Sequence, residues 1–426
     1  MRRIISLILI CGIPLTLFTG CFDAWEVTEM AYVYSIGIEK GVTDKLRMTI
    51  QVPSMKGGKG GGESGGGEGG QKQSDIETIT IDCPTFYSGV NMVNSFLSRQ
   101  LNYMHAKYLV FSESLAREGI DTYITALVRG RQIRRQMNII VTKGSASEFL
   151  KEHTTAVSSS LSKKQQNMID QGGNTGFFSE TTYGDMINVS KASYSQAIAI
   201  LAAVNDDSRF KDGEGKGDTP FKTSGDYYAG ELVRKGGSKV EFLGTAVFDG
   251  GKMVGELNGD ETRTLLMLRG EFERGFFAVE DPKKSDTTIT LDVRMQKKPN
   301  VKVQFQDGEP IIDVKVFLEG DILGIQSTVD YEGKELKPLI ENEFKRLMKE
   351  QIDKTIKKCQ NLNSDVFKFG TVAAMHFLTI EEWEKYDWFE KFKYAQVNTQ
   401  VNFKIRRTGT MLKSSEINST EGKKGE

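Results

Sequence analysis

Hydrophobic and polar positions alternate in short segments of the first half of the chain, as they do in β-strands. Residues 45–52 alternate strictly, with four apolar side chains on one face. Successive side chains of a strand point to opposite faces, so this pattern predicts a half-buried strand. An apolar, β-rich run at 31–38 precedes it, and the turn at 41–44 predicts that the two strands form a hairpin.

Beyond this hairpin, strand and helix patterns take turns along the chain. A helix is predicted where apolar residues recur every three or four positions, and a strand where a short β-rich run is bounded by turn residues. Residues 145–148 form a capping box that opens a further helix. The order predicts a sheet covered by helices. Its elements are a strand at 76–81, a helix at 87–101, a strand at 108–111, a helix at 120–128 and a strand at 138–142.

Other stretches carry no clear period. Residues 57–70 are rich in glycine and predict a surface loop, because the Gly-Lys-Ser/Thr step of a phosphate-binding loop is missing. Residues 155–166 and 172–176 indicate a linker or a mobile helix. Residues 197–204 are apolar on every side, so their periodicity does not distinguish a buried strand from a buried helix. Residues 206–224 are rich in Gly, Asp and Lys and predict a loop.

The second half combines strands with one long helix. A turn at 249–251 between apolar runs at 240–248 and 253–257 predicts a hairpin. Residues 335–358 carry a stripe of seven apolar residues, which is typical of a helix that packs one face on a core. The remaining predicted elements are a short helix at 261–268 and strands at 287–294, 301–305, 311–318 and 397–405.

The first residues have the features of a secretory signal. Arg2 and Arg3 precede an apolar run at 4–18, which is shorter than the roughly 20 residues that a membrane-spanning helix needs. The run ends in Leu-x-Thr-Gly-Cys at Cys21, which resembles the lipobox of bacterial lipoproteins. The resemblance implies that the Cys21 thiol receives a diacylglyceryl group and that the chain is cut before it. The alternative is an ordinary signal peptide with a chance cysteine.

Composition places the chain among soluble globular proteins, with 38% hydrophobic and 27% charged residues over its full length. The net charge is −1, and it becomes −3 once the two signal arginines are removed, so no nucleic-acid partner is expected. A basic cluster lacks interleaved aromatic residues and predicts a solvated helix or loop face: Arg129, Arg131, Arg134 and Arg135. No later stretch is apolar enough to span a membrane.

Cysteine and histidine offer little chemistry. Cys11 leaves with the signal; Cys83 and Cys359 either form one disulfide or stay as free buried thiols. The three histidines have no metal-binding spacing and predict surface or packed positions: His105, His153 and His376. The acidic pairs at 206–207 and 381–382 are expected to be solvated. No hydrolase or metalloprotease motif is present, so we expect no catalytic residue, no cofactor and no metal, and we predict a binding protein.

Four stretches, in the right order over nearly the whole mature chain, resemble the C subunit of the spore germinant receptors. The first runs from Cys21 through Trp25 to Tyr34-Ser-Ile-Gly-Ile-Glu39, and the second is the glycine-rich insertion. The third begins with Gly244-Thr-Ala-Val-Phe248 and includes Glu261, Arg263 and Gly270. The fourth includes residues 365–370, Trp383, Trp388, Phe392 and Ile405-Arg-Arg-Thr-Gly409. The chain departs from this family at Phe22, where Trp is usual, and at Lys368, where Gly is frequent.

The resemblance implies an elongated, multi-domain α+β lipoprotein with mixed sheets covered by helices. Its expected parts are a signal peptide at 1–20, an α/β region at 21–205, a linker at 206–225, an α+β domain at 226–407 and a disordered tail at 408–426. It also implies a non-enzymatic subunit that joins membrane-spanning A and B subunits in a receptor that triggers spore germination. The lipid would hold it on the outer face of the cell membrane, which in the spore is the inner membrane.

Two other functions stay open. A lipoprotein that captures a small nutrient itself would have the same anchor, and a cell-wall enzyme would work in the same place. Within the resembling stretches, Trp383, Trp388 and Phe392 are most simply explained as core residues. Glu261 and Arg263 are most simply explained as a structural ion pair at a helix start.

Overall fold

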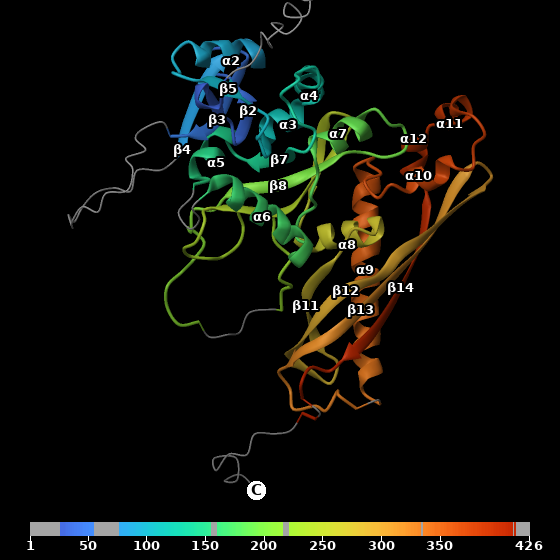
Figure 1. The fold of residues 1–426 in the computed structure, drawn as a ribbon. Helices are drawn as coiled ribbons and strands as arrows, with labels where there is room; N and C mark the ends of the chain where they lie inside the picture. The colour runs from blue at the N-terminus through green and yellow to red at the C-terminus, as the bar shows by residue number, and fades with distance from the viewer. Residues whose placement is uncertain are drawn as a thin grey trace, which may run out of the picture.

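The computed structural model describes residues 26–54, 76–154, 160–215, 221–333, 335–411 and 413–414. The predicted signal peptide, Cys21, the glycine-rich run and the end of the tail lie outside these residues. The described chain is α+β, with a large mixed sheet, a long four-stranded sheet and helices against both (Figure 1). The predicted fold class is therefore confirmed.

An eight-stranded sheet forms the first part of the molecule, in the order β10-β9-β8-β7-β6-β2-β3-β4. Its centre, from β2 to β8, is parallel, and the strands on either side are antiparallel. Parallel strands are buried on both faces, which explains why residues 197–204 are apolar throughout and form a strand. The strands are β2 (Ser35–Lys40), β3 (Leu46–Pro53), β4 (Ile76–Cys83), β6 (Tyr108–Ser112), β7 (Asn138–Lys143), β8 (Ile198–Val204), β9 (Val240–Asp249) and β10 (Lys252–Leu257).

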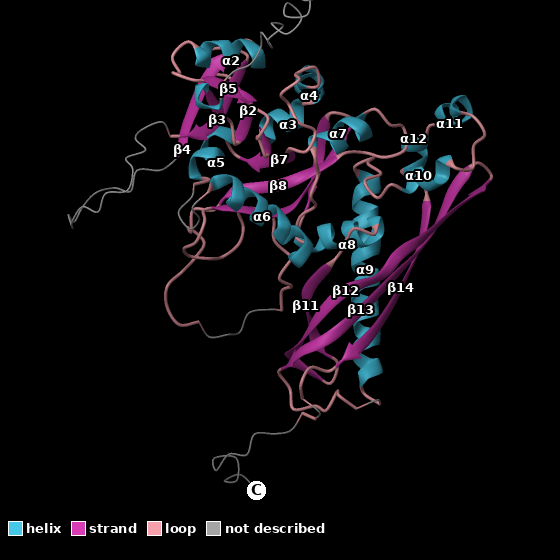
Figure 2. Cartoon of the chain, viewed as in Figure 1, coloured by secondary structure: helices cyan, strands magenta, loops and turns pink. Residues whose placement is uncertain are grey.

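Helices cover both faces of this sheet (Figure 2). In β6, Leu109 and Phe111 belong to one hydrophobic core, whereas Tyr108 and Val110 belong to the core on the other face. The helices are α2 (Phe86–Asn94), α3 (Glu113–Glu118), α4 (Asp121–Leu127), α5 (Ala146–Glu152), α6 (Leu161–Thr175) and α7 (Tyr183–Ser190). A short 3-10 turn, η1 (Val27–Glu29), and a two-stranded parallel pair, β1 (Met30–Tyr32) with β5 (Gln100–Asn102), complete this part.

The second part is a long, twisted sheet in the order β11-β12-β13-β14 with α9 on one face. The stripe predicted for the long helix is the buried one, since Ile340, Phe344, Ile352 and Ile356 lie in this core. The elements are α8 (Gly259–Arg269), β11 (Arg274–Asp281), β12 (Lys284–Gln306), β13 (Glu309–Ile325), α9 (Lys337–Asn361), α10 (Phe369–Ala374), α11 (Ile380–Tyr386), α12 (Trp388–Phe392) and β14 (Gln396–Arg407).

Three sequence predictions about single elements are wrong. The helix predicted at 87–101 ends at Asn94, whose side chain accepts a hydrogen bond from the Leu101 N–H, and the last two residues of the predicted helix belong to β5. The strands predicted at 287–294 and 301–305 are one strand, β12, with register shifts on either side of Lys297 near Pro299. The strand predicted at 45–52 is not half-buried, because α5 covers its polar face and Gln51 is fully buried.

The hairpin at 240–257 lies in the first sheet, although the sequence places it in the second domain. β9 pairs with β8, so the sheet continues across the predicted linker. The end of that linker is also fixed, because the Asp260 N–H donates to the Gly225 carbonyl and Thr223 hydrogen-bonds to Asp260. The stretch predicted as linker or mobile helix contains α6, a helix of four turns.

Candidate interaction site

The predicted site residue, Cys21, lies outside the described residues. The structure does show the surroundings of the other residues that the sequence singled out. Among the residues that the structure describes, no three Cys, His, Asp or Glu side chains gather as a metal site. Within that same part of the chain, no helix has both the length and the apolar character to cross a bilayer. Cys83 and Cys359 are free and buried in separate cores, so of the two open alternatives the structure has the free buried thiols.

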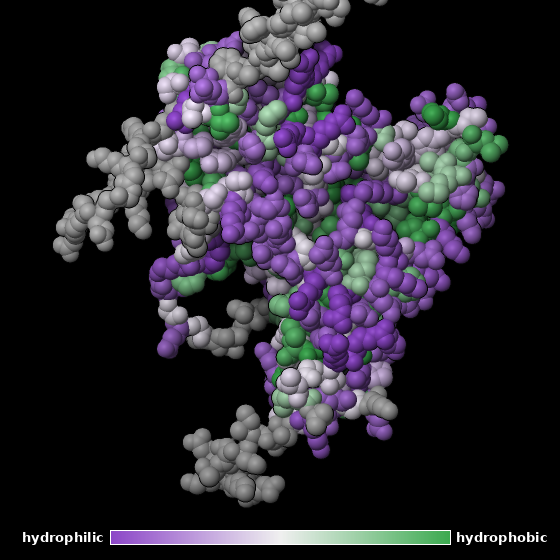
Figure 3. Space-filling model, in the orientation of Figure 1, coloured by the Kyte–Doolittle hydropathy of each residue, from purple (hydrophilic) through white to green (hydrophobic). Residues whose placement is uncertain are grey.

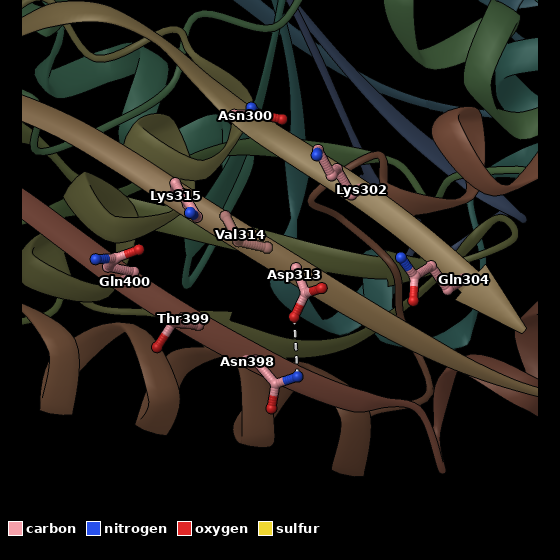
Figure 4. Close-up of a pocket in the computed structure, with 9 residues that line it drawn as sticks. All are labelled: Asn300, Lys302, Gln304, Asp313, Val314, Lys315, Asn398, Thr399 and Gln400. Carbon is pink, nitrogen blue, oxygen red and sulfur yellow. Dashed lines mark hydrogen bonds between the residues drawn. The ribbon is translucent and has the colours of Figure 1, made fainter. Parts of the chain in front are cut away.

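A polar groove of about 390 Å³ crosses the outer face of the four-stranded sheet (Figure 4). It lies on the face opposite α9, and the Asn398 amide donates to the Asp313 carboxylate across it at 2.9 Å. The groove is open to solvent, unlike the enclosed, mostly apolar pockets that hold small ligands. Its lining comes from three strands: Asn300, Lys302, Gln304, Asp313, Val314, Lys315, Asn398, Thr399 and Gln400.

The histidines take different positions. His105 and His376 are exposed, whereas His153 is buried beside the rings of Phe149 and Tyr108. Burial, helped by nearby Lys164, lowers the pKa of His153 to about 3. Neither of its ring nitrogens has a hydrogen-bond partner among the described residues. The predicted surface or packed roles are confirmed, and His153 is neutral at physiological pH.

The aromatic residues of the fourth stretch form a core, as predicted: Trp383, Trp388 and Phe392 are all buried. Trp388 also donates its indole N–H to Asp365 at 2.9 Å. The same carboxylate accepts from the backbone N–H groups of Phe367, Phe369 and Gly370 at 2.7–3.2 Å. Complete burial raises the pKa of Asp365 to about 6 against these four donors. Asp365 is therefore a structural centre for residues 365–370.

Glu261 and Arg263 do not pair with each other. Glu261 caps α8 through the Asn258 N–H and pairs with Lys358 of α9 at 2.6 Å. Arg263 is buried between the rings of Phe177 and Phe277, at 4.1 and 4.3 Å, and pairs with Asp260 at 3.5 Å. Burial lowers the pKa of Arg263 to about 10. Both residues join elements together, so the expected structural role is confirmed. The expected ion pair between Glu261 and Arg263 is wrong.

The feature that the sequence did not reveal is an exposed apolar tip between α10 and α11, formed by Met375, Leu378 and Ile380. Leu378 is 93% exposed and the other two are more than 70% exposed. Figure 3 shows hydrophobic residues on the surface over these helices. A short apolar run has the same sequence pattern in a buried strand and in an exposed loop. Its periodicity therefore could not predict that these side chains are exposed.

The tip is exposed but firmly held. Between its members, Phe377 points inward and packs on the rings of Phe305, Trp383 and Tyr386, with centroids 5.1–5.5 Å apart. The Tyr386 hydroxyl donates to the Gly308 carbonyl at 3.1 Å, and the Trp383 indole donates to Ser193 at 2.9 Å. A rigid apolar projection of this kind is typical of a protein-binding surface, because little ordering remains to be done on binding.

Comparison with known proteins supplies the family. The model of the "Spore germination protein N-terminal domain" matches residues 23–203, and that of "Spore germination B3/ GerAC like, C-terminal" matches residues 243–409. The chain belongs to the germination protein C family. Its relatives include the putative spore germination protein YfkR of Bacillus subtilis, 22% identical over 95% of this chain and 97% of the relative. Spore germination protein KC of the same organism is 24% identical over 92% of each chain.

The family also has a solved relative. The crystal structure of the GerBC protein superposes with a TM-score of 0.52 at 16% sequence identity, covering 87% of this chain and 96% of the other. At this identity the likeness speaks for the fold alone. Together, the family models and the relatives connect this chain with spore germination.

Proposed function

We propose that this chain is the lipid-anchored C subunit of a nutrient germinant receptor. It joins the membrane-spanning A and B subunits as a scaffold and contributes no chemistry of its own. Lipid on Cys21 holds it on the outer face of the cell membrane, in the spore the inner membrane. Family membership supports the germination role, and the lipobox-like ending at Cys21 supports the anchor.

The apolar tip is the observation that carries the partner-binding part of this proposal. Apolar side chains that stay exposed on a rigid element cost solubility, and such patches mark interaction surfaces. Leu378 is the most exposed of the three residues of the tip. A membrane-spanning subunit that rises from the bilayer beside the anchored chain is the partner that fits.

Leu378→Asp tests the tip. We expect recovery of the A and B subunits in a pull-down from membranes to fall about 30-fold, because a central apolar contact contributes about 2 kcal/mol or more. The thermal midpoint should not change, since Leu378 contacts little within the chain. Leu323→Asp is the matched control, because Leu323 is 54% exposed at the far end of β13. Equal recovery of both variants would contradict the role of the tip.

Cys21→Ala tests the anchor. Without the thiol no lipid can be attached, and the protein should leave the membrane fraction when the partner subunits are absent. Two acyl chains are needed for firm anchoring, and their loss removes the effective concentration that a tether provides. Nutrient germination should therefore fall more than folding does, while a receptor-independent germination route stays normal. Equal loss on both routes would mean that the chain is not a receptor subunit.

A further inference from the structure

The described chain begins beside α2. β1 pairs with β5 in parallel register, Met30 opposite Gln100, and the Asn102 amide lies 3.0 Å from the Met30 sulfur. Residue 26 is therefore close to the segment that links α2 to β5. Four residues lie between Cys21 and Glu26, and the five chain steps that join them span at most about 18 Å. A lipid on Cys21 thus fixes the membrane within a short distance of α2.

Large apolar side chains are exposed around α2. Phe96, two residues after the end of the helix, is 62% exposed, and Met92 and Tyr87 of the helix are also exposed. Met104 lies nearby, in the turn that follows β5, where Tyr103 packs on Phe86. These residues sit at the end of the molecule formed by α2 and β5 (Figure 1).

Arginines without a carboxylate partner gather at the same place. Most arginines of the described chain form ion pairs, and six do not. One of the six is Arg407; the other five are Arg99, after α2, and the four exposed arginines of the loop between α4 and β7. That loop touches α2, because a Cβ on Gly130 would lie 2.0 Å from the Tyr87 hydroxyl. Glu26 and Glu29 are the exposed carboxylates at the chain entry.

We infer that this surface rests on the anionic headgroups of the bilayer. The α2 surface is defined by Tyr87, Met92, Phe96, Arg99, Met104, Arg129, Arg131, Arg134 and Arg135. Exposed arginines attract anionic lipid, and aromatic and other apolar side chains enter the interface beside them. The inference rests on the proposed lipid at Cys21, whose short link leaves the α2 surface nearest the bilayer. It also explains why these arginines lack carboxylate partners among the described residues.

The test uses the full chain, processed and lipidated, in vesicles of phosphatidylglycerol and phosphatidylcholine. An environment-sensitive fluorophore is attached at Phe96→Cys, or at Leu323→Cys as the control at the opposite end of the molecule. Cys83 and Cys359 are buried and should not take the label. We expect a blue-shifted emission and quenching by spin-labelled lipid at position 96 in anionic vesicles only. The same signal at both positions, or none at position 96, would overturn the inference.

Charge reversal separates lipid attraction from simple proximity. In the triple variant Arg129→Glu, Arg131→Glu and Arg134→Glu, the ratio of docked to undocked protein should fall on the order of 100-fold, about fivefold or more per arginine. The control reverses three exposed lysines elsewhere: Lys284→Glu, Lys302→Glu and Lys315→Glu. A signal at position 96 that survives the arginine reversal, as binding to a protein surface or tether crowding would give, overturns the inference. The intact mass reports the lipid on Cys21, so failure of the anchor is distinguished from failure of docking.

Discussion

Single residues in this protein act mainly by joining segments that are distant in sequence. The carbonyl of Asp365 accepts from the Gln196 N–H at the entry to β8, while its carboxylate orders residues 367–370. Lys368 adopts a left-handed backbone with φ of 65°, which Gly adopts without steric cost. This conformation agrees with the expectation, drawn from the family resemblance, that Gly is frequent at this position. The Lys368 ammonium pairs with Glu271 at 2.9 Å.

His153 predicts a pH dependence of stability. Its folded pKa of about 3 lies below the ordinary value of 6.5, so the unfolded chain binds a proton first as pH falls. The stability that neutral His153 provides is complete above pH 6.5 and is lost as pH falls through the interval down to 3. We expect its share of the unfolding free energy to fall by about 1.4 kcal/mol per pH unit between pH 6 and 4.

Denaturant unfolding at several pH values measures this slope. His153→Phe should reduce the slope of the unfolding free energy against pH by the amount that corresponds to about one proton taken up on unfolding. A phenyl ring fits beside Phe149 and Tyr108 and does not titrate. His376→Phe is the control for replacing a histidine by phenylalanine, because His376 is exposed. Identical slopes in the wild type and the His153→Phe variant would show that His153 is protonated, or solvated, in the folded protein.

At the scale of elements, the connection between β3 and β4 predicts a tolerant spacer. The two strands are antiparallel neighbours with Pro53 opposite Ile76, so the ends of the connection lie side by side. Deleting residues 60–69 leaves enough chain to close it, and halving a loop changes its closure entropy by only about 0.6 kcal/mol. We expect an unchanged thermal midpoint and near-normal nutrient germination. A large loss of germination at an unchanged midpoint would mean that the glycine-rich run makes contacts of its own.

The spacing of apolar residues predicted those elements that bury a regular apolar face. The hairpin at 240–257, the strands from 108 to 142 and the long helix α9 all formed where their apolar faces indicated. It failed where a distant contact decides the outcome, as for β5, which exists because β1 lies beside it. The apolar tip and the α2 surface escaped prediction for a related reason. An exposed apolar residue is recognised only by what fails to cover it, and cover is a tertiary property.

At the scale of the whole molecule, the two proposed surfaces support one orientation. α2 and α11 both lie toward the same end of the molecule, away from the lower end of β14 (Figure 1). With the α2 surface on the bilayer, the apolar tip would stand close to the membrane, where spanning subunits emerge. The long four-stranded sheet would then extend outward. A lipid anchor alone permits any tilt, whereas a second contact beside it restricts the tilt and lowers the entropy cost of meeting a partner.

The continuous first sheet also predicts that the chain behaves as one body on either side of the long connection between β8 and β9. β8 is buried on both faces and pairs with β9, and Ile198, Val247 and Leu257 share a core with α8 and α9. A protease site inserted after Gly215, in an exposed loop, should therefore give two fragments that elute together in native buffer. They should separate only in denaturant, because parting them would expose a fully apolar strand edge. Uncut protein of the same sequence is the control for size. Fragments that part in native buffer would show instead that the sheet does not hold the two regions together, and that residues 206–225 link independent domains.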